Sequence, residues 1–525
     1  MKHPIDKAIS ILAKIKQLGC EEVIVCPGGR NAPFVEVLSK NSVFKTQTLF
    51  EERSAGFYGC GLTKKSNKPV AVITTSGTAV AELLPSVIEA YYQGLPLIVI
   101  TADRPKSYRG SGAPQSIKQD QILSEFCQAS FDLEADLSLL HNYQKMPSGP
   151  MHINICFDEP LLINKKSNYD DEFKVGEEPS SEREAQLSIK NLNYKNIKQP
   201  LIILGQLDGS EAQFVLTILK KLNTAIYAEA HSGLKYNQEI KHLIIEAGAK
   251  AISTIFKSKG FDSVIRIGGI PTLRFWRDLD KLDVPVINFS KNNFSGLSRI
   301  KENSNHLAQL NTITEAGFIG KLPTEFKENS IIEKSNALLK KYPNSEQTFV
   351  YMLSKLTSSS DQVFLANSLP IREWDSFASP QGSPKVQTLR GANGIDGNIS
   401  YFLGLSKPDI TNVCILGDLT ALYDMAAGFL YKKYYQGHKI KIVIINNGGG
   451  KIFTPLFNNE AFENNHDIEF SGWAKMFGLG YQRVNNPSQI KFTDQNEVIE
   501  LIPDNNQSAC FTSDLNSFVK ELAGE

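Results

Sequence analysis

Asp418 and Asn447 have the residue types and the spacing of a cation site. Asp418 follows the apolar run at 413–416, and Asn447 follows the apolar run at 442–445. The two residues are 29 apart (447 − 418), close to the roughly 30 residues of a strand–helix–strand unit. Carboxylate, amide and glycine carbonyl oxygens are hard ligands that suit Mg²⁺. The pattern favours a cation and diphosphate site; the simpler alternative is a tight turn with a capping aspartate.

The residues around this pair agree with an anion beside the cation. The glycines at 448–450 let the backbone approach an anion closely, and Thr420 is a candidate hydroxyl partner. A helix that begins after Asp418 would offer free N–H groups to a diphosphate. In an open parallel sheet, both strand ends would meet at the edge where ligands bind.

A second candidate is Glu52, in the segment 50–56 that follows a strand-like run and opens a helix. A carboxyl group beside apolar neighbours has a raised proton affinity. In its neutral form it can hydrogen-bond a heterocyclic nitrogen. The alternative is a helix N-terminus that simply favours acidic residues.

Arginine is scarce, so its placement is informative. Only 12 of the 56 basic residues are Arg by count, and half of these fall beside Gly, Pro or acidic residues after strand-like runs. Arginine binds carboxylates through a planar fork, which lysine lacks. As a set these residues favour recognition of an anionic substrate, although any one of them can be a structural ion pair. They are Arg30, Arg53, Arg104, Arg109, Arg372 and Arg390.

Three α/β blocks must position these residues. Short apolar runs alternate with helical stretches, which is typical of parallel sheets covered on both faces. Helices are expected at 5–17, 54–64, 79–92 and 422–435, a linker at 165–184, and a helix-like region at 324–347. Strands are expected at 22–26, 70–75, 97–101 and 152–157, then at 201–204, 225–228, 264–267 and 284–289, then at 363–366, 386–389, 413–416 and 442–445.

Length and composition exclude several classes of protein. A chain of 525 residues needs more than one domain. The formal net charge of zero gives no sign of a nucleic-acid partner, and no apolar run is long enough to span a membrane. Seven dispersed cysteines without a CxxC pair predict buried, reduced thiols and a cytoplasmic protein.

Ten segments together carry a specific resemblance. Among them are CPGGRNAP at 26–33, EERSAGF at 51–57, TADRP at 101–105, RGANGIDG at 390–397 and NNGGGKIF at 446–453. The chain resembles the thiamine-diphosphate-dependent decarboxylase superfamily. Within it, the chain is similar to the 2-succinyl-5-enolpyruvyl-6-hydroxy-3-cyclohexene-1-carboxylate synthase family.

The resemblance implies an architecture and a reaction. It implies a pyrimidine-binding domain at 1–180, a central domain at 185–330 and a diphosphate-binding domain at 345–525. It also implies a dimer or tetramer with active sites between subunits. The implied enzyme uses thiamine diphosphate and Mg²⁺ or Mn²⁺, decarboxylates 2-oxoglutarate and adds the succinyl group to isochorismate in menaquinone biosynthesis.

The resemblance also assigns roles to residues. Glu52 matches the glutamate that contacts the aminopyrimidine ring, and Asp418, Asn447 and the Gly449 carbonyl match the metal ligands. The remaining matches are Gly417, Thr420, Ala421, Gly450 and Ser368 beside the cofactor, Ile395 beneath it, Arg372 and Arg390 (with Ser368) near the 2-oxoglutarate-derived part, Arg30, Arg104 and Gln115 on the isochorismate side, and Arg274 at a basic substrate-binding position.

Five positions depart from the family pattern without removing a matched ligand. Gly29 stands where a serine is usual, Glu51 where an aspartate is common, and Gly448 where an asparagine is usual, while Leu389 precedes Arg390 where an asparagine is common. Lys451 is also unusual before Ile-Phe. Two alternatives stay open: another thiamine-diphosphate 2-oxo acid decarboxylase or carboligase, and a catalytically silent homologue.

Overall fold

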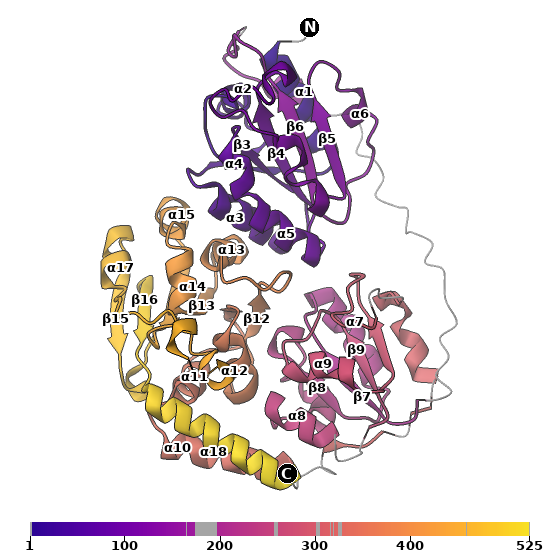
Figure 1. Ribbon diagram of the computed structural model, residues 1–525, viewed down its shortest axis with the longest axis vertical. Coiled ribbons are helices and arrows are strands. Elements are labelled where there is room, and N and C mark those ends of the chain that lie inside the picture. Colours follow the sequence, from indigo (N-terminus) through magenta and orange to yellow (C-terminus); the bar gives the residue numbers. More distant parts are fainter. Residues whose placement is uncertain are drawn as a thin grey trace. The chain divides into compact units, whose positions relative to one another are not determined.

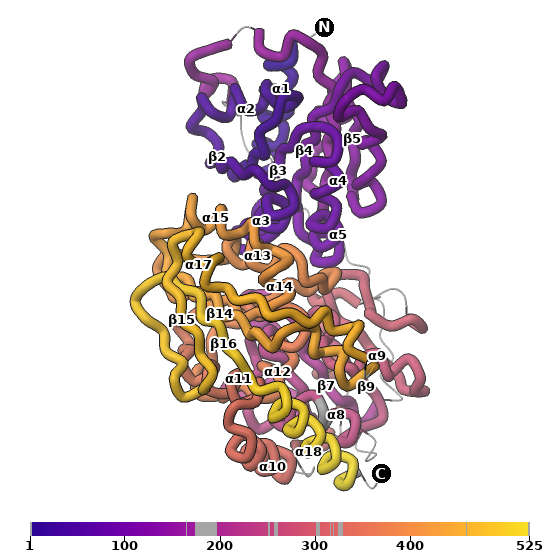
Figure 2. Tube along the Cα trace, turned by 60° about the vertical axis from the view of Figure 1, so that its left-hand side comes forward, coloured from indigo at the N-terminus to yellow at the C-terminus, as the bar shows by residue number. Residues whose placement is uncertain are grey.

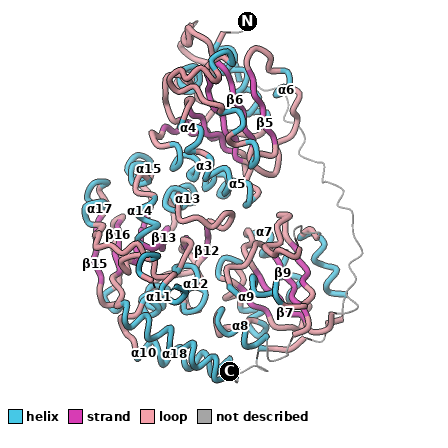
Figure 3. The backbone as a smooth tube through the Cα atoms, viewed as in Figure 1, coloured by secondary structure: helices cyan, strands magenta, loops and turns pink. Residues whose placement is uncertain are grey.

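The fold is built on three parallel sheets, each flanked by helices (Figures 1 and 3). The computed structural model describes residues 3–163, 165–173, 197–256, 261–300, 305–315, 317–318, 320–323, 328–457 and 459–523. Within these ranges every pair of neighbouring strands runs parallel. The predicted α/β class with parallel sheets is therefore confirmed.

The first sheet has six strands in the order β2-β1-β3-β4-β6-β5. Its central strands are apolar and buried along their whole length, as expected for a sheet covered on both faces. The strands are β1 (Glu22–Val25), β2 (Lys45–Thr48), β3 (Val70–Thr74), β4 (Leu97–Asp103), β5 (Ala129–Leu133) and β6 (Met151–Cys156).

Helices cover the two faces of this sheet because successive strand residues point in opposite directions. Val23 and Ile73 pack with Ile11 of α1 (Pro4–Gln17) on one face, where α2 (Ala32–Leu38) also lies. Val72 faces α3 (Glu52–Ser66) on the other. The remaining helices of this block are α4 (Thr78–Glu82), α5 (Leu84–Gln93) and α6 (Ser138–His141).

Two later helices belong to the same compact unit as the first sheet. This unit comprises Met1–Arg183, Gly391–Ser406 and Tyr423–Tyr435, and therefore includes α13 (Asn398–Leu405) and α15 (Ala427–Tyr434). Gly61 of α3 meets Gly404 of α13 so closely that a Cβ on Gly61 would lie 2.2 Å from the carbonyl oxygen of Tyr401. The backbones of α3 and α13 thus pack directly on each other.

The second compact unit holds the other two sheets. The four-stranded sheet has the order β10-β9-β7-β8, and the six-stranded sheet has the order β12-β11-β13-β14-β16-β15. The strands are β7 (Pro200–Leu204), β8 (Ile226–Ala228), β9 (Ser263–Ile267), β10 (Val286–Phe289), β11 (Gln362–Leu365), β12 (Lys385–Thr388), β13 (Thr411–Gly417), β14 (Lys439–Ile445), β15 (Gly480–Val484) and β16 (Glu497–Leu501).

Helices flank both sheets of this unit. Leu201 and Ile203 of β7 face one helical layer, and Ile202 and Leu204 face another. Two long helices, α10 (Glu328–Lys341) and α18 (Asn505–Ala523), lie side by side (Figure 2). The others are α7 (Gly209–Leu219), α8 (Ala249–Ile255), α9 (Arg274–Asp278), α11 (Glu346–Ser354), α12 (Leu369–Phe377), α14 (Asp418–Tyr423), α16 (Thr454–Phe457) and α17 (Ser471–Phe477).

Several expected elements need correction. The helix expected at 79–92 is two helices, α4 and α5, and the helix expected at 422–435 is α14 and α15 with a break between them. The region expected at 324–347 is α10 followed by the start of α11. Strands β2, β5, β15 and β16 were not expected.

The predicted domain limits remain a prediction. Each predicted domain contains one of the three sheets. The boundary at 180–185 and most of the expected linker at 165–184 lie outside the described residues, as does 324–327.

Five of the seven cysteines are buried, whereas Cys127 is half-buried and Cys510 is exposed, so burial was predicted wrongly for these two. Across the described ranges, no helix combines the length and the apolar character that a membrane crossing requires.

Candidate active site

Asp418 and Asn447 lie at the same edge of the third sheet. β13 and β14 are parallel neighbours, with Gly417 opposite Ile445. Asp418 begins α14, directly after β13, and Asn447 follows β14 by two residues. The spacing argument therefore located both side chains correctly, at the carboxyl ends of adjacent strands.

Hydrogen bonds tie the aspartate to the glycine turn. Asp418 Oδ2 accepts from the backbone N–H groups of Gly448 (2.9 Å) and Gly449 (3.0 Å). Gly449 has a φ of 144°, and a Cβ there would lie 2.5 Å from the Glu463 carbonyl oxygen. Only glycine fits this position, because both the backbone angle and the neighbouring chain exclude a side chain.

Asn447 presents one buried oxygen that lacks a partner. Its Nδ2 donates to Glu346 Oε2 at 2.9 Å. Its Oδ1 is buried and accepts no hydrogen bond from any residue that the structure describes. A buried amide oxygen without a donor is costly, and a bound cation would satisfy it. The oxygen atoms of Asp418, Asn447 and the glycine turn therefore fit as ligands of a divalent cation.

The acids around this turn are affected by burial. Burial raises the pKa of Asp418, although hydrogen bonds from the backbone of Leu419, Gly448 and Gly449 oppose the rise. Burial likewise raises the pKa of Glu346 to about 7. In the described parts of the chain, no three His, Cys, Asp or Glu side chains group as a metal site. A cation here would need amide, backbone and non-protein oxygens, which suits Mg²⁺.

The predicted diphosphate residues lie around Asp418 in the sequence and the fold. Thr420 and Ala421 are buried in the first turn of α14. Gly417 ends β13, and nothing lies within 4 Å of where its Cβ would be. Gly450 donates its N–H to the Glu463 carbonyl oxygen at 2.5 Å.

Ser368 holds a strained backbone at the start of α12. Its φ is +77°, a region that non-glycine residues seldom occupy, and its side chain makes no capping hydrogen bond. Arg372 Nη1 donates to the Ser368 carbonyl oxygen. Arg390 Nη1 donates to Asn367 Oδ1 at 3.1 Å, and Asn367 precedes Ser368. Arg372 and Arg390 thus both bind at residues 367–368, one through a backbone oxygen and the other through a side-chain oxygen.

Arg274 behaves differently from the other two arginines of the second unit. It begins α9, its side chain is 69% exposed, and its nearest acid is Asp278 at 3.9 Å. Arg372 and Arg390, by contrast, donate to residues 368 and 367.

A buried acid pair near the arginines was missed by sequence reasoning. Glu229 Oε1 accepts from the Thr272 N–H at 2.6 Å, and Asp375 Oδ1 accepts from the Ala230 N–H at 2.6 Å. Burial, followed by the charge of Asp375, raises the pKa of Glu229 to about 8, while Arg390 opposes the rise. Nothing in the local sequence marks Glu229, because its partners come from distant segments.

Glu51 and Glu52 have different hydrogen-bond partners at the start of α3. Glu51 is the N-cap, and its carboxylate accepts from the N–H groups of Arg53 (3.2 Å) and Ser54 (2.8 Å). Glu52 Oε1 instead accepts from Thr74 Oγ1 at 3.2 Å, at the end of β3. Burial raises the pKa of Glu52, with a smaller contribution from Glu51. The capping alternative therefore describes Glu51, and Glu52 remains available for chemistry.

The first sheet brings three loops together at its carboxyl edge. Its order places β1, β3 and β4 side by side. A Cβ on Gly28 would lie 2.6 Å from Thr75 Cβ, so the loops after β1 and β3 touch. Gln115 has a φ of +56° and lies against Gly77. A Cβ added to Gly77 would lie 3.2 Å from Gln115 Cα.

The predicted substrate arginines of this unit donate to backbone carbonyl oxygens, Arg30 after β6 and Arg104 in the loop after β4. Arg30 Nη1 donates to the Phe157 carbonyl oxygen at 3.1 Å, and its Nη2 lies 3.4 Å from the exposed Glu159. Arg104 Nε donates to the Pro114 carbonyl oxygen at 3.1 Å.

Two other arginines of this unit contact residues within it. Arg109 pairs with Asp103 and Asp132, and Arg53 donates to the Tyr423 carbonyl oxygen. Arg109 therefore has the ion pairs of the structural alternative, whereas the role of Arg53 stays a prediction.

The predicted site residues fall into two sets. The first compact unit contains Glu52, Arg30, Arg104, Gln115 and the half-buried Ile395. The second unit contains the others: Asp418, Asn447, Gly417, Gly449, Gly450, Thr420, Ala421, Ser368, Arg274, Arg372 and Arg390.

Comparison with known proteins identifies the class of enzyme. Residues 8–123 match the family described as "Thiamine pyrophosphate enzyme, N-terminal TPP binding domain". With three parallel α/β sheets and these residues at their edges, the chain is a thiamine-diphosphate-dependent enzyme.

Curated relatives narrow the class. Three proteins named 2-succinyl-5-enolpyruvyl-6-hydroxy-3-cyclohexene-1-carboxylate synthase are similar along nearly their whole length. The protein from Bdellovibrio bacteriovorus is 38% identical (95% of this chain, 96% of the relative). The protein from Akkermansia muciniphila is 33% identical (97% of this chain, 98% of the relative). The protein from Bacillus velezensis is 30% identical (100% of this chain, 100% of the relative). This chain belongs to the 2-succinyl-5-enolpyruvyl-6-hydroxy-3-cyclohexene-1-carboxylate synthase family.

Proposed function

We propose that this chain decarboxylates 2-oxoglutarate and joins the succinyl group to isochorismate, giving 2-succinyl-5-enolpyruvyl-6-hydroxy-3-cyclohexene-1-carboxylate and CO₂ in menaquinone biosynthesis. The observation that carries the proposal is the buried, donor-free Asn447 Oδ1 beside the Asp418–glycine turn. It occurs in a chain similar to synthases of that name along its whole length.

Asp418, Asn447 and the Gly449 carbonyl hold Mg²⁺ or Mn²⁺ in this proposal. The donor-free amide oxygen and the requirement for glycine at 449 support it. Gly417, Thr420, Ala421 and Gly450 lie beside the diphosphate.

Glu52 holds a proton at the pyrimidine ring. Its raised pKa and its partner Thr74 support this role, because a neutral carboxyl group can donate to a ring nitrogen. Thiamine diphosphate, when bound, supplies the electron sink for decarboxylation. Ile395 packs beneath the cofactor.

The arginines hold the substrate carboxylates. Each substrate carries two carboxylates, and only one is lost as CO₂. Arg372 and Arg390, with Ser368, bind the 2-oxoglutarate side, and both are already oriented by backbone and amide oxygens at 367–368. Arg30, Arg104 and Gln115 bind isochorismate. Fixed guanidinium groups bind and align anions without reorganisation during the reaction. Arg274 is a further substrate contact in this proposal.

The active enzyme is a dimer or tetramer in the cytoplasm, with no nucleic-acid partner. Each active site combines Glu52 of one subunit with Asp418 of another. Support for this part of the proposal comes from the family resemblance.

Substrate selectivity tests the function. The purified chain with thiamine diphosphate and Mg²⁺ should consume isochorismate with 2-oxoglutarate and not with pyruvate. Faster turnover of pyruvate would favour another 2-oxo acid decarboxylase, and failure to bind thiamine diphosphate by calorimetry would favour a silent homologue.

A further inference from the structure

The loop at 104–118 carries two residues of the proposed isochorismate site but has little structure of its own. Arg104 and Gln115 stand near its two ends. Its only regular element is the short turn η1 (Lys106–Tyr108), and Gly110 and Gly112 both have positive φ. Most of its residues are exposed. Contacts with the rest of the unit must therefore fix its conformation.

Arg109 makes those contacts from the middle of the loop. Its Nη1 and Nη2 donate to the two carboxylate oxygens of Asp132 at 2.9 and 2.7 Å, a bidentate pair. Nη2 also donates to Asp103 Oδ2 at 3.1 Å, and Asp120 lies 3.7 Å from Nη1. Asp103 ends β4, and Asp132 lies in β5. One guanidinium thus joins the loop to two strands.

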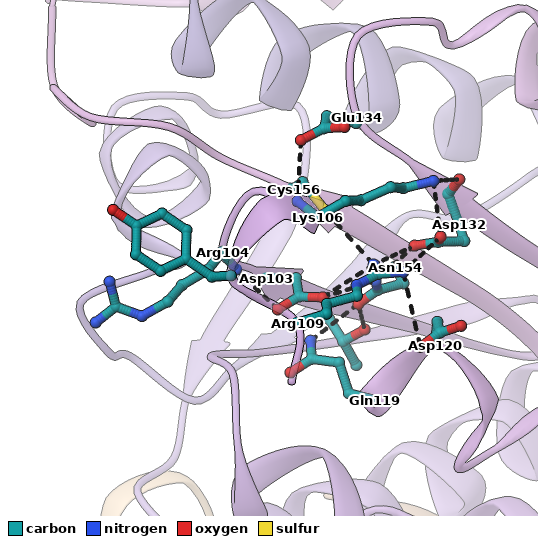
Figure 4. Close-up of polar contacts among 12 residues, drawn as sticks. Asp103, Arg104, Lys106, Arg109, Gln119, Asp120, Asp132, Glu134, Asn154 and Cys156 are labelled. Atoms are coloured by element: carbon teal, nitrogen blue, oxygen red, sulfur yellow. Dashed lines mark hydrogen bonds and ion pairs between the residues drawn. The ribbon is translucent and has the colours of Figure 1, made fainter. Parts of the chain in front are cut away.

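Asn154 of β6 connects the two acids behind Arg109. Its Nδ2 donates to Asp103 Oδ2 (3.2 Å) and Asp132 Oδ1 (2.9 Å), and its Oδ1 accepts from Gln119 Nε2 (2.9 Å). Figure 4 shows this group gathered around Arg109 and Asn154, with the Arg104 side chain extended away from it. Asp103, Arg109, Asp132, Asn154 and Gln119 are called the Arg109 network below.

Gln119 extends the network to the far end of the loop. It is fully buried at the start of η2 (Gln119–Gln121). Its Nε2 also donates to the Ala102 carbonyl oxygen (3.1 Å), and its Oε1 accepts from the Gly77 N–H (3.2 Å). Gly77 is the residue against which Gln115 packs. The same network therefore fixes the surface that supports Gln115.

The strength of this pairing exceeds that of an exposed ion pair. Burial raises the pKa of Asp132, but hydrogen bonds from Arg109, Lys106 and Asn154 together lower it by more. The pKa of Asp132 therefore lies well below its usual range. Bidentate, charge-assisted hydrogen bonds also fix direction, which lysine cannot reproduce.

We propose that Arg109 is a positioning residue for isochorismate: it holds the loop at 104–118 so that Arg104 and Gln115 meet the second substrate. The proposal rests on the function proposed above. Arg109 itself does not touch the substrate, because its guanidinium is committed to Asp103 and Asp132.

Steady-state kinetics of Arg109→Met and Arg109→Lys test the proposal. We expect the KM for isochorismate to rise at least tenfold in both variants, with the KM for 2-oxoglutarate and thiamine diphosphate affinity changed less than twofold. Asp132→Asn should give the same pattern to a smaller extent. Val23→Ala is the matched control, since Val23 is buried in β1 of the same sheet and does not belong to the Arg109 network. It should lower Tm without changing either KM.

Equal rises in both KM values, an unchanged KM for isochorismate, or the same rise in Val23→Ala would overturn the proposal. Hydrogen exchange tests, without substrate, whether the Arg109 network holds the loop at 104–118. Amides at 110–116 should exchange at least tenfold faster in Arg109→Met, while those of α1 stay unchanged. Unchanged exchange at 110–116 would also overturn the proposal. If the wild-type chain does not consume isochorismate, the function proposed above fails, and the exchange result alone decides whether Arg109 orders this loop.

Discussion

Glu346 Oε2 accepts a 2.9 Å hydrogen bond from Asn447 Nδ2, and this bond determines the orientation of the Asn447 amide. Because Glu346 fixes Asn447 Nδ2, Asn447 Oδ1 faces away from Glu346 and has no hydrogen-bond donor among the described residues. Glu346 is held in turn by its backbone N–H, which donates to Ser508 Oγ at 2.9 Å. A residue 101 positions before Asn447 (447 − 346) thus prepares a proposed metal ligand.

The first prediction concerns metal affinity. Glu346→Ala should weaken Mn²⁺ binding about 10- to 100-fold, as loss of a supporting hydrogen bond commonly does at metal sites. Electron paramagnetic resonance of free Mn²⁺, with thiamine diphosphate present, measures this directly. Glu346→Gln keeps an acceptor for Asn447 and should bind Mn²⁺ within about threefold of the wild type.

Ser345→Ala is the matched control for that prediction. Ser345 caps α11 by accepting from the Thr348 N–H, so its loss weakens the same helix start and leaves the Glu346–Asn447 bond in place. Mn²⁺ affinity should stay near the wild-type value. Equal weakening in Glu346→Ala and Ser345→Ala would mean that Glu346 acts only through stability.

The second prediction concerns the shared active site. Glu52→Gln and Asp418→Ala should each lose most activity, and Glu52→Gln should still bind thiamine diphosphate by calorimetry. If sites form between subunits, a mixed dimer of the two variants has one intact site. Random mixing should then restore up to about a quarter of wild-type activity. No restoration after unfolding and refolding the mixture together would place Glu52 and Asp418 of one site in the same subunit.

The third prediction concerns the contact between α3 and α13. Gly61→Ala should destabilise the protein by about 1–3 kcal/mol or more, because its Cβ would meet a backbone carbonyl that cannot move freely. Gly472→Ala in α17 is the control, since nothing lies within 4 Å of where its Cβ would be. Thermal unfolding should show a lower Tm for Gly61→Ala only. An equal Tm for both variants would contradict the close packing.

The fourth prediction concerns pH. Asp424 is buried and accepts from the Ser400 N–H (2.7 Å) and Oγ (2.9 Å); burial raises its pKa from 3.8 to about 7. A carboxyl group with a raised folded-state pKa stabilises the fold least when ionised, so its contribution falls as pH rises from about 4 to about 7. Asp424→Asn should therefore gain stability relative to the wild type across this window, by at most about 4 kcal/mol, and level off above it.

The control for the pH prediction has the opposite sign. Asp136 is exposed, and hydrogen bonds from Ser138 lower its pKa. Asp136→Asn should be less stable than the wild type by a constant amount above the unfolded-state pKa, and this deficit should disappear only as pH falls through the lower folded-state pKa. Tm measured from pH 4 to pH 8 distinguishes the two cases. A pH-independent Tm difference for Asp424→Asn would show that Asp424 does not titrate in this window.

The sequence predicted the central strands and the placement of Asp418 and Asn447 for physical reasons. Strands buried on both faces are continuous apolar runs, and the spacing of a strand–helix–strand unit is nearly constant. Edge strand β2 (KTQT) has no apolar signal, and Glu497 and Glu500 interrupt β16. Those strands could not be found from apolar runs alone.

Long-range polar partners were beyond local reasoning. Glu346, Glu229 and Asp132 act through residues far away in the chain, and no motif surrounds them. Arg109 illustrates the opposite error: its type and position resembled those of a substrate arginine, but only the fold brought Asp103 and Asp132 to it.

The stoichiometry of the reaction tests the central claim most directly. Purified protein with thiamine diphosphate, Mg²⁺, 2-oxoglutarate and isochorismate should release one CO₂ for each isochorismate consumed, and omission of isochorismate should nearly abolish CO₂ release. Equally fast CO₂ release without isochorismate, or from pyruvate in place of 2-oxoglutarate, would contradict the proposed function.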